Sequence, residues 1–149
     1  RPCNAPEYRQ FAFWLGEWNV GPAGGGPSAG VNRITRAQDG CVVLENYTAG
    51  AFTGTSISFY DEQRRVWHQT WMSSTGGPLY LEGGLNADGA MEMTDRDLPN
   101  STASRVINRV TWTLNADGSI RQFWQNSNDN GATWTTVFDG RYTRRPTGQ

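Results

Sequence analysis

The stretch Phe11-Ala12-Phe13-Trp14-Leu15-Gly16-Glu17-Trp18 decides how this chain is expected to fold. Three aromatic residues and a leucine are crowded into a short run, and Gly16-x-Trp18 then opens the first expected strand. In a small β domain, such a cluster is best used as a hydrophobic plug that closes one end of a curled sheet. Pro6 suits the first position of a helix, so the sequence predicts a short helix or turn between Pro6 and Trp14.

The residues after this stretch have the pattern of successive β-strands. Turn sequences such as Asn86-Ala87-Asp88-Gly89 separate short runs rich in β-branched and aromatic residues. We expect about ten strands, near Trp18–Val20, Val31–Arg36, Cys41–Thr48, Thr53–Tyr60, Val66–Met72, Leu79–Gly83, Ala90–Thr94, Arg105–Leu114, Ser119–Asn126 and Thr133–Tyr142. Because short turns and no helices join them, the sequence predicts an all-β fold, an antiparallel up-and-down β-barrel. A β-sandwich is the alternative.

The length and composition fit one domain over residues 1–149 and exclude several classes of function. The formal net charge is −1, so no basic field is present to attract nucleic acid. No apolar run approaches the ~20 residues that a membrane-spanning helix needs. All basic residues are Arg, which excludes lysine Schiff-base chemistry. With two cysteines and one histidine, neither a metal site nor a cofactor is expected.

The two cysteines, Cys3 and Cys41, are expected to form a disulfide bond. Cys3 lies close to the start of the chain, where a bond could tether the N-terminal segment. The chain starts with neither Met nor a signal peptide, as a processed chain would. These features predict a secreted or periplasmic protein. Two free thiols in a cytosolic protein are the alternative.

The Gly16-x-Trp18 motif and the all-β meander after it resemble the lipocalin and wider calycin pattern. In that pattern an Arg from the last strand packs over the Trp, which implies Arg144 or Arg141 here. The whole chain resembles small, mostly uncharacterised, secreted bacterial lipocalin-like domains. The matching segments are Phe11 to Trp18, Gly40-Cys41 to Glu45, Trp67 to Trp71, Arg121 to Trp124 and Phe138 to Tyr142. Ala12 departs from the pattern, which has Asp there. The resemblance implies a β-barrel and no settled activity.

The segment Ser127-Asn128-Asp129-Asn130-Gly131-Ala132-Thr133-Trp134 resembles the Asp-box of sialidase propellers, S-x-D-x-G-x-x-W. Propellers carry several such boxes and this chain carries one. In the box, the Asp accepts N–H groups of a turn and the Trp packs beneath it. We therefore interpret the segment as a structural hairpin and not as a glycan site.

Alternation along the strands predicts which side chains face the barrel interior. The apolar faces, expected to point inward, are Trp67, Gln69 and Trp71; Val106, Asn108, Val110, Trp112 and Leu114; Ile120, Gln122 and Trp124; and Trp134, Thr136, Phe138 and Tyr142. Each of the first three faces carries one amide. A buried amide without partners costs roughly 1–3 kcal/mol, so these amides either satisfy one another in a filled barrel or face a ligand.

The second alternative gives candidate ligand-binding residues, which are Gln69, Trp71, Asn108, Trp112, Gln122 and Trp124. His68, Arg109 and Arg121 fall on the opposite faces of their strands. Indoles stack on flat or apolar molecules, and amides both donate and accept hydrogen bonds. The expected ligand is therefore a small, neutral, partly aromatic or apolar molecule.

Glu45 is a candidate inward carboxylate, although alternation in its strand is ambiguous between Val43-x-Glu45-x-Tyr47 and Val42-x-Leu44. A buried Glu has a raised pKa and could act as an acid or base; alternatively, it pairs with an Arg. Three hypotheses of function follow: an extracytoplasmic binding protein; a cofactor-free isomerase, cyclase or lyase that uses Glu45 with Tyr60 or Tyr142; and a structural or self-associating subunit. An open polar and aromatic cavity would favour the first two.

Overall fold

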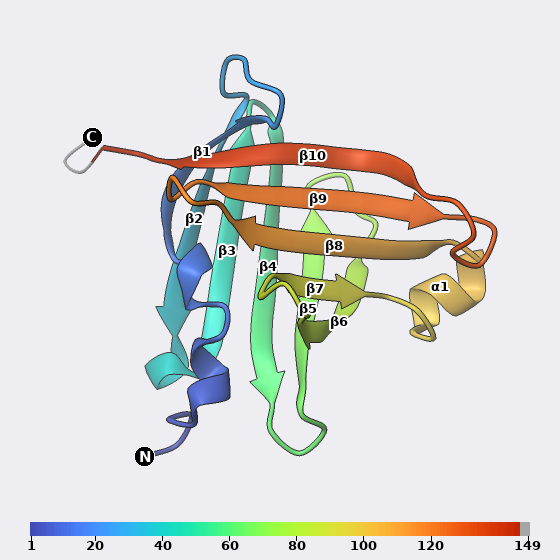
Figure 1. Ribbon diagram of the computed structural model, residues 1–149, viewed down its shortest axis with the longest axis horizontal. Helices are drawn as coiled ribbons and strands as arrows, with labels where there is room; N and C mark the ends of the chain where they lie inside the picture. The colour runs from blue at the N-terminus through green and yellow to red at the C-terminus, as the bar shows by residue number, and fades with distance from the viewer. Residues whose placement is uncertain (147–149) are drawn as a thin grey trace.

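A computed structural model describes residues 1–146, and its strands form a closed barrel (Figure 1). The ten strands in this range are β1 (Gly16–Pro22), β2 (Gly30–Ala37), β3 (Val42–Ala49), β4 (Phe52–Asp61), β5 (Val66–Ser73), β6 (Leu79–Leu85), β7 (Met91–Thr94), β8 (Ile107–Leu114), β9 (Ile120–Ser127) and β10 (Thr135–Arg144). Each strand pairs antiparallel with the next along the chain, and β1 pairs with β10. The predicted up-and-down barrel is confirmed, and the sandwich alternative is wrong.

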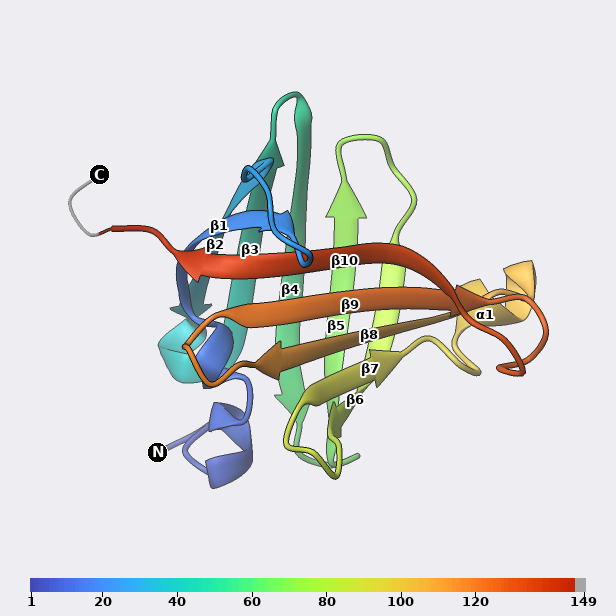
Figure 2. The ribbon, with the colours of Figure 1, turned by 45° about the horizontal axis from the view of Figure 1, so that its top comes forward.

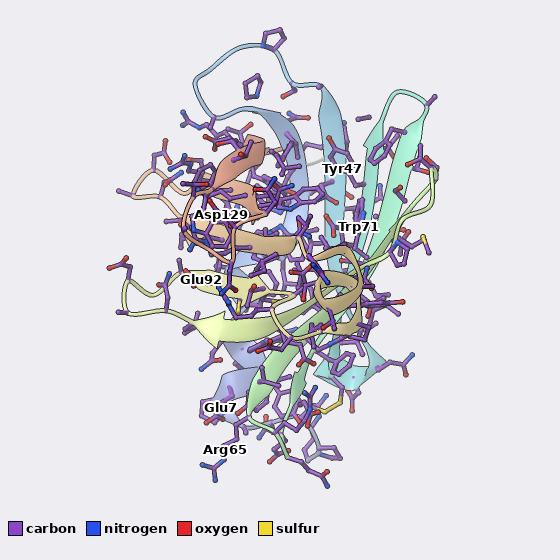
Figure 3. The ribbon with its side chains drawn as sticks, turned by 90° about the vertical axis from the view of Figure 1, so that its right-hand side faces the viewer. Glu7, Tyr47, Arg65, Trp71, Glu92 and Asp129 are labelled. Carbon is purple, nitrogen blue, oxygen red and sulfur yellow. A yellow bond between two sulfur atoms is a disulfide. The ribbon has the colours of Figure 1, made fainter. Side chains whose placement is uncertain are left out.

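The barrel has two distinct ends. Figure 1 shows β7 to β10 lying across β2 to β6. The N-terminal segment lies at one end, and the β3–β4 and β5–β6 loops lie at the other (Figure 2). Tyr47 and Trp71 are toward the loop end, whereas Glu7 and Arg65 are toward the N-terminal end (Figure 3). This arrangement decides where a cavity can form.

The plug at the N-terminal end consists of two 3₁₀ turns, η1 (Pro6–Arg9) and η2 (Ala12–Trp14), joined through Phe11. The backbone of Phe11 has φ −104° and ψ 10°, which interrupts the expected single helix. Residues three apart are eclipsed in a 3₁₀ turn, so Phe11 and Trp14 stack with ring centroids 4.7 Å apart. Both side chains are fully buried, and Phe11 also contacts Trp112 edge-on at 5.1 Å.

Trp18 at the start of β1 is fully buried above this plug. Its Nε1–H donates to the carbonyl oxygen of Trp14 at 2.8 Å. The guanidinium of Arg144, its partner in β10, lies 4.2 Å from the centre of the ring. Of the two arginines that the resemblance implies, Arg144 therefore makes this contact, whereas Arg141 pairs with Asp117.

The Cys3–Cys41 disulfide is also present, with the two Cα atoms 5.2 Å apart. It joins the N-terminal segment to the end of η3 (Gln38–Gly40), just before β3. The plug is thus attached covalently to the barrel wall.

One element was not expected, the short helix α1 (Pro99–Ser104) between β7 and β8. The prediction that no helix separates the strands is wrong, and β8 begins at Ile107, not at Arg105. Pro99 occupies the first turn, and the left-handed backbone of Arg105, φ 60° and ψ 21°, ends the helix. Its other residues are small, and all but Ala103 are polar, so it lacks the apolar repeat by which helices are identified.

A β-bulge between Thr136 and Phe138 corrects the expected alternation in β10. Because of the extra residue at Val137, the residues of this strand that precede it point to the opposite face from the one that simple alternation predicts. Trp134 lies on the outer face, where the guanidinium of Arg109 is 3.9 Å from its ring centre. In the hairpin before it, Asp129 Oδ1 accepts the backbone N–H of Thr133 at 2.8 Å. The hydroxyls of Thr133 and Ser127 also donate to the Asp129 carboxylate. The hydrogen bond from the Thr133 hydroxyl, followed by those from the Thr133 backbone and Ser127, lowers the Asp129 pKa to about 2.

Candidate functional site

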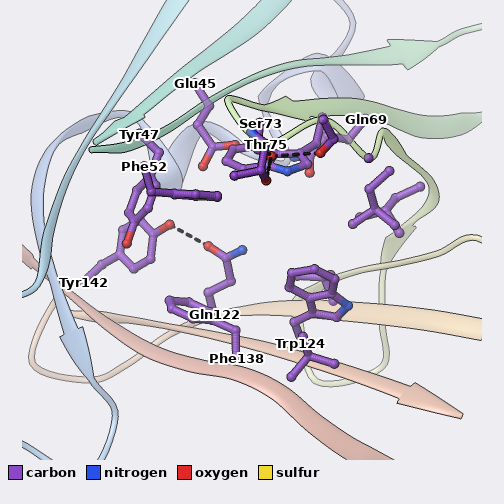
Figure 4. Close-up of a pocket in the computed structure, with 17 residues that line it drawn as sticks. Glu45, Tyr47, Phe52, Gln69, Ser73, Thr75, Gln122, Trp124, Phe138 and Tyr142 are labelled. Carbon is purple, nitrogen blue, oxygen red and sulfur yellow. Dashed lines mark hydrogen bonds between the residues drawn. The ribbon is translucent and has the colours of Figure 1, made fainter. Parts of the chain in front are cut away.

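The barrel contains a cavity of about 450 Å³ between the plug and the loop end (Figure 4). Its lining includes Ser73 at the end of β5 and Thr75, Gly76 and Gly77 of the β5–β6 loop. Phe52 and Val137, which also line it, are 37% and 44% exposed, so the cavity opens to solvent at this end. The barrel is therefore open at one end and filled at the other.

Six aromatic side chains form much of the cavity wall: Tyr47, Phe52, Trp71, Trp124, Phe138 and Tyr142. Two of these rings lie directly against glycines. A Cβ at Gly54 would overlap the indole of Trp71, and a Cβ at Gly140 would overlap the ring of Phe138. The glycines let the rings rest on the backbone and leave the space between the walls open.

Glu45 supplies a carboxylate from β3 to the polar side of the cavity (Figure 4). It is 5% exposed and faces inward with Val43 and Tyr47, which settles the ambiguity in the sequence pattern. Ser56 Oγ donates to one carboxylate oxygen at 2.7 Å, and Asn32 Nδ2 donates to the other at 2.7 Å. Burial raises the pKa of Glu45, and the two hydrogen bonds only partly oppose this.

Tyr142 extends this network from Asn32 to a second amide, Gln122. Asn32 Nδ2 also donates to the Tyr142 hydroxyl at 2.8 Å, and that hydroxyl donates to Gln122 Oε1 at 2.5 Å. Burial, followed by the charge of Glu45, raises the pKa of Tyr142 well above its ordinary value. The phenol therefore stays neutral. The hydrogen-bonded series Glu45–Asn32–Tyr142–Gln122 holds polar groups in fixed positions at the inner end of the cavity, called the cavity floor below.

The structure brings together six of the residues that the sequence suggested for the site. Gln69, Trp71, Gln122, Trp124, Glu45 and Tyr142 all line the cavity. Gln69 Nε2 donates to Ser58 Oγ at 2.9 Å, so one side of this buried amide is satisfied within the protein.

The remaining candidates lie elsewhere. Trp112 is buried in the core, against Phe11 of the plug. Asn108 bridges two protein groups: its Oδ1 accepts from Trp124 Nε1 at 2.8 Å, and its Nδ2 donates to Asp95 at 2.9 Å. Tyr60 packs at the plug end, 5.5 Å from the ring of Tyr8.

Sequence reasoning missed several cavity residues and the amide that connects the polar groups. Phe52 lines the cavity and was not foreseen, whereas Tyr47 and Phe138, which also line it, were placed on candidate inward faces but not named as ligand-binding residues. Asn32 lies fully buried behind Glu45. Asn32 could have been identified because it alternates with Gly30 and Ile34 on an otherwise apolar face. Phe52, at the start of β4, carried no comparable signal.

The charge of the cavity comes from a single group. Among the lining residues described, none is Arg, Lys or His, and Glu45 is the only carboxylate. Within residues 1–146, no three His, Cys, Asp or Glu side chains are grouped as a metal ion would require. No helix in the same range is long and apolar enough to cross a membrane. No protein-family model matches the chain, and no curated protein matches it either.

Proposed function

We propose that this protein binds a small organic molecule inside the barrel. One observation carries the proposal, namely an open cavity of about 450 Å³ with aromatic walls and a few convergent polar groups. Ligand-binding pockets in proteins usually have volumes of about 300–1,000 Å³ and the same division between apolar walls and sparse polar groups. The open cavity favours this function over a purely structural or self-associating role, for which a filled barrel was expected.

The walls and floor indicate the shape of the ligand. The rings of Trp71, Trp124 and Phe138 line the cavity and suit a flat or apolar body. Gln122, Gln69 and Glu45 lie at the floor and suit a polar end that exchanges hydrogen bonds. The Cys3–Cys41 disulfide supports an extracytoplasmic location for this binding, since such bonds persist in oxidising compartments.

Glu45 supports a second candidate function, proton transfer by a cofactor-free isomerase, cyclase or lyase. A carboxyl group with a raised pKa inside a cavity is suited to general acid or base chemistry. Tyr142 would assist from the same cavity, whereas Tyr60 lies at the plug end. Turnover of a carbonyl or alkene substrate that is lost in Glu45→Gln would identify this activity.

Fluorescence of 1-N-phenylnaphthylamine, an uncharged probe that brightens in apolar surroundings, tests binding directly. We expect saturable enhancement by the parent protein. Trp71→Ala should weaken binding several-fold, because an aromatic contact is worth about 0.5–1.5 kcal/mol. Trp134→Ala is the matched control, since it removes an indole from the outer face.

The two outcomes separate clearly. Binding inside the barrel is supported if Trp71→Ala binds the probe more weakly than the parent protein and Trp134→Ala binds it equally well. No saturable enhancement, or equal losses in both variants, would overturn the proposal.

A further inference from the structure

We infer that the cavity selects an organic cation, a molecule with a flat aromatic body and a protonated amine that pairs with the carboxylate of Glu45. This inference rests on the proposed binding function and specifies the chemical class of the ligand. It depends on the buried position of Glu45 away from any positively charged lining residue described, and on the aromatic side chains that line the same cavity.

Glu45 is a buried acid without a cationic partner among residues 1–146. Its two hydrogen-bond donors, Ser56 and Asn32, are neutral. Moving a carboxylate out of water is costly unless an opposite charge meets it. A carboxylate accepts about four hydrogen bonds, so after these two it can still receive an ammonium group from the cavity.

Each element packed around Glu45 contributes neutral groups. β2 contributes Asn32, β4 contributes Ser56, and β10 contributes Tyr142. Tyr47 on its own strand has a pKa raised by burial, with a further increase from the charge of Glu45. Because the pKa of both tyrosines is raised, they stay protonated over the range in which Glu45 loses its proton, so Glu45 is the group whose titration changes the charge of this part of the cavity.

The aromatic walls add a second attraction for positive charge. The faces of Trp, Tyr and Phe rings attract cations through their quadrupoles when these lie within about 6 Å. Tyr47, Phe52 and Trp71 follow one another along one side of the cavity, with ring centres 6.2 and 6.5 Å apart. An amine that enters past these rings would meet attractive surfaces from the opening to Glu45.

An anionic ligand fits the charge of this cavity poorly. The lining residues described include no basic side chain, and the floor carries a negative charge when Glu45 is ionised. A neutral ligand remains compatible with the amides Gln69 and Gln122 alone. A protonated Glu45 could also donate a hydrogen bond to a neutral ligand, which the dependence on pH would reveal.

The test compares three molecules that share an indole body: tryptamine, a cation; tryptophol, its neutral alcohol; and indole-3-propionate, an anion. Isothermal titration calorimetry at about pH 8 keeps the amine charged, since alkylammonium groups titrate near pH 10. We expect tryptamine to bind at least about tenfold more tightly than tryptophol, because hydrogen bonds to charged groups are the stronger ones. Indole-3-propionate should bind most weakly.

Two variants identify the group responsible. Glu45→Gln should abolish the preference for tryptamine over tryptophol. Glu17→Gln is the matched control, because Glu17 lies on the exposed outer face against Arg33. It should leave the preference unchanged.

The pH profile of the parent protein tests the same claim without any variant. As pH falls through the titration of Glu45, tryptamine affinity should fall, and its binding should release up to one proton. Tryptophol affinity should stay constant or rise as Glu45 becomes protonated.

Failures of the two proposals look different. Equal affinity for tryptamine and tryptophol, or a tryptamine preference that survives Glu45→Gln, would overturn cation selection. If none of the three indoles binds while 1-N-phenylnaphthylamine does, the inferred ligand class is wrong and binding in the cavity stands. If neither the indoles nor the naphthylamine binds, both proposals fall.

Discussion

Gly54→Ala should destabilise the barrel because the indole of Trp71 occupies the space that the new methyl group would take. The three nearest ring atoms of Trp71 all lie under 3.0 Å from the position of that Cβ. Gly54 is not among the glycines with positive φ, so the steric overlap is the main penalty. Overpacking of this kind costs about 1–3 kcal/mol in unfolding free energy.

A double-mutant cycle with Trp71→Ala isolates this contact. Without the indole, Gly54→Ala should become neutral or stabilising by up to about 1 kcal/mol, because glycine weakens a strand relative to alanine. Urea unfolding followed by circular dichroism measures all four proteins. Gly54→Ala alone should also weaken binding of 1-N-phenylnaphthylamine, since the indole must then move from the wall.

Gly84→Ala in β6 is the control, because a Cβ there would meet no atom within 4 Å. It should leave stability almost unchanged. The packing argument is refuted if Gly54→Ala costs the same with and without Trp71. It is equally refuted if Gly54→Ala costs no more than Gly84→Ala.

Three further predictions concern the plug and the polar floor. Removing the disulfide by Cys3→Ala with Cys41→Ala should lower the unfolding free energy by about 4 kcal/mol, given the 38-residue separation; an unchanged urea midpoint would contradict this. Trp18→Ala should cost about 3–5 kcal/mol as a large deletion in the core, and Trp134→Ala much less; equal losses would show that Trp18 is not central to the plug. Burial raises the pKa of Glu45, so the folded protein retains a proton that the unfolded chain loses above about pH 4.5. Stability should therefore fall as pH rises from there through the folded pKa, and Glu45→Gln should remove that slope; parallel profiles would contradict the assignment.

Much of the barrel could be predicted from the sequence because local signals repeat along it. Alternating apolar residues and Asp-Gly turns indicated the strands. The resemblance carried by Gly16-x-Trp18 implied a closed end with Arg144 or Arg141 over Trp18, and Arg144 occupies that place. Helix α1 could not be predicted because its polar residues show no periodicity. Trp134 was assigned to the wrong face because a bulge adds one residue without changing the residue types around it.

About half of the candidate site was also accessible from alternation. Gln69, Trp71, Gln122 and Trp124 alternate cleanly on strands β5 and β9, and all four line the cavity. Which groups surround Glu45 depends on the residues of the strands paired with β3. Those residues are known only from the strand register, which alternation does not give. The openness of the cavity depends on the positions of rings such as Trp71 over Gly54, which alternation does not describe.

The most direct test of binding inside the barrel is the ¹H–¹⁵N NMR spectrum of the seven tryptophan indole groups, with and without 1-N-phenylnaphthylamine. The ligand should shift the signals of Trp71 and Trp124, which line the cavity. Trp18 beneath Arg144 and Trp134 beneath Arg109 should not respond. Shifts confined to Trp134, or no shift at Trp71 and Trp124 under saturating probe, would contradict the account.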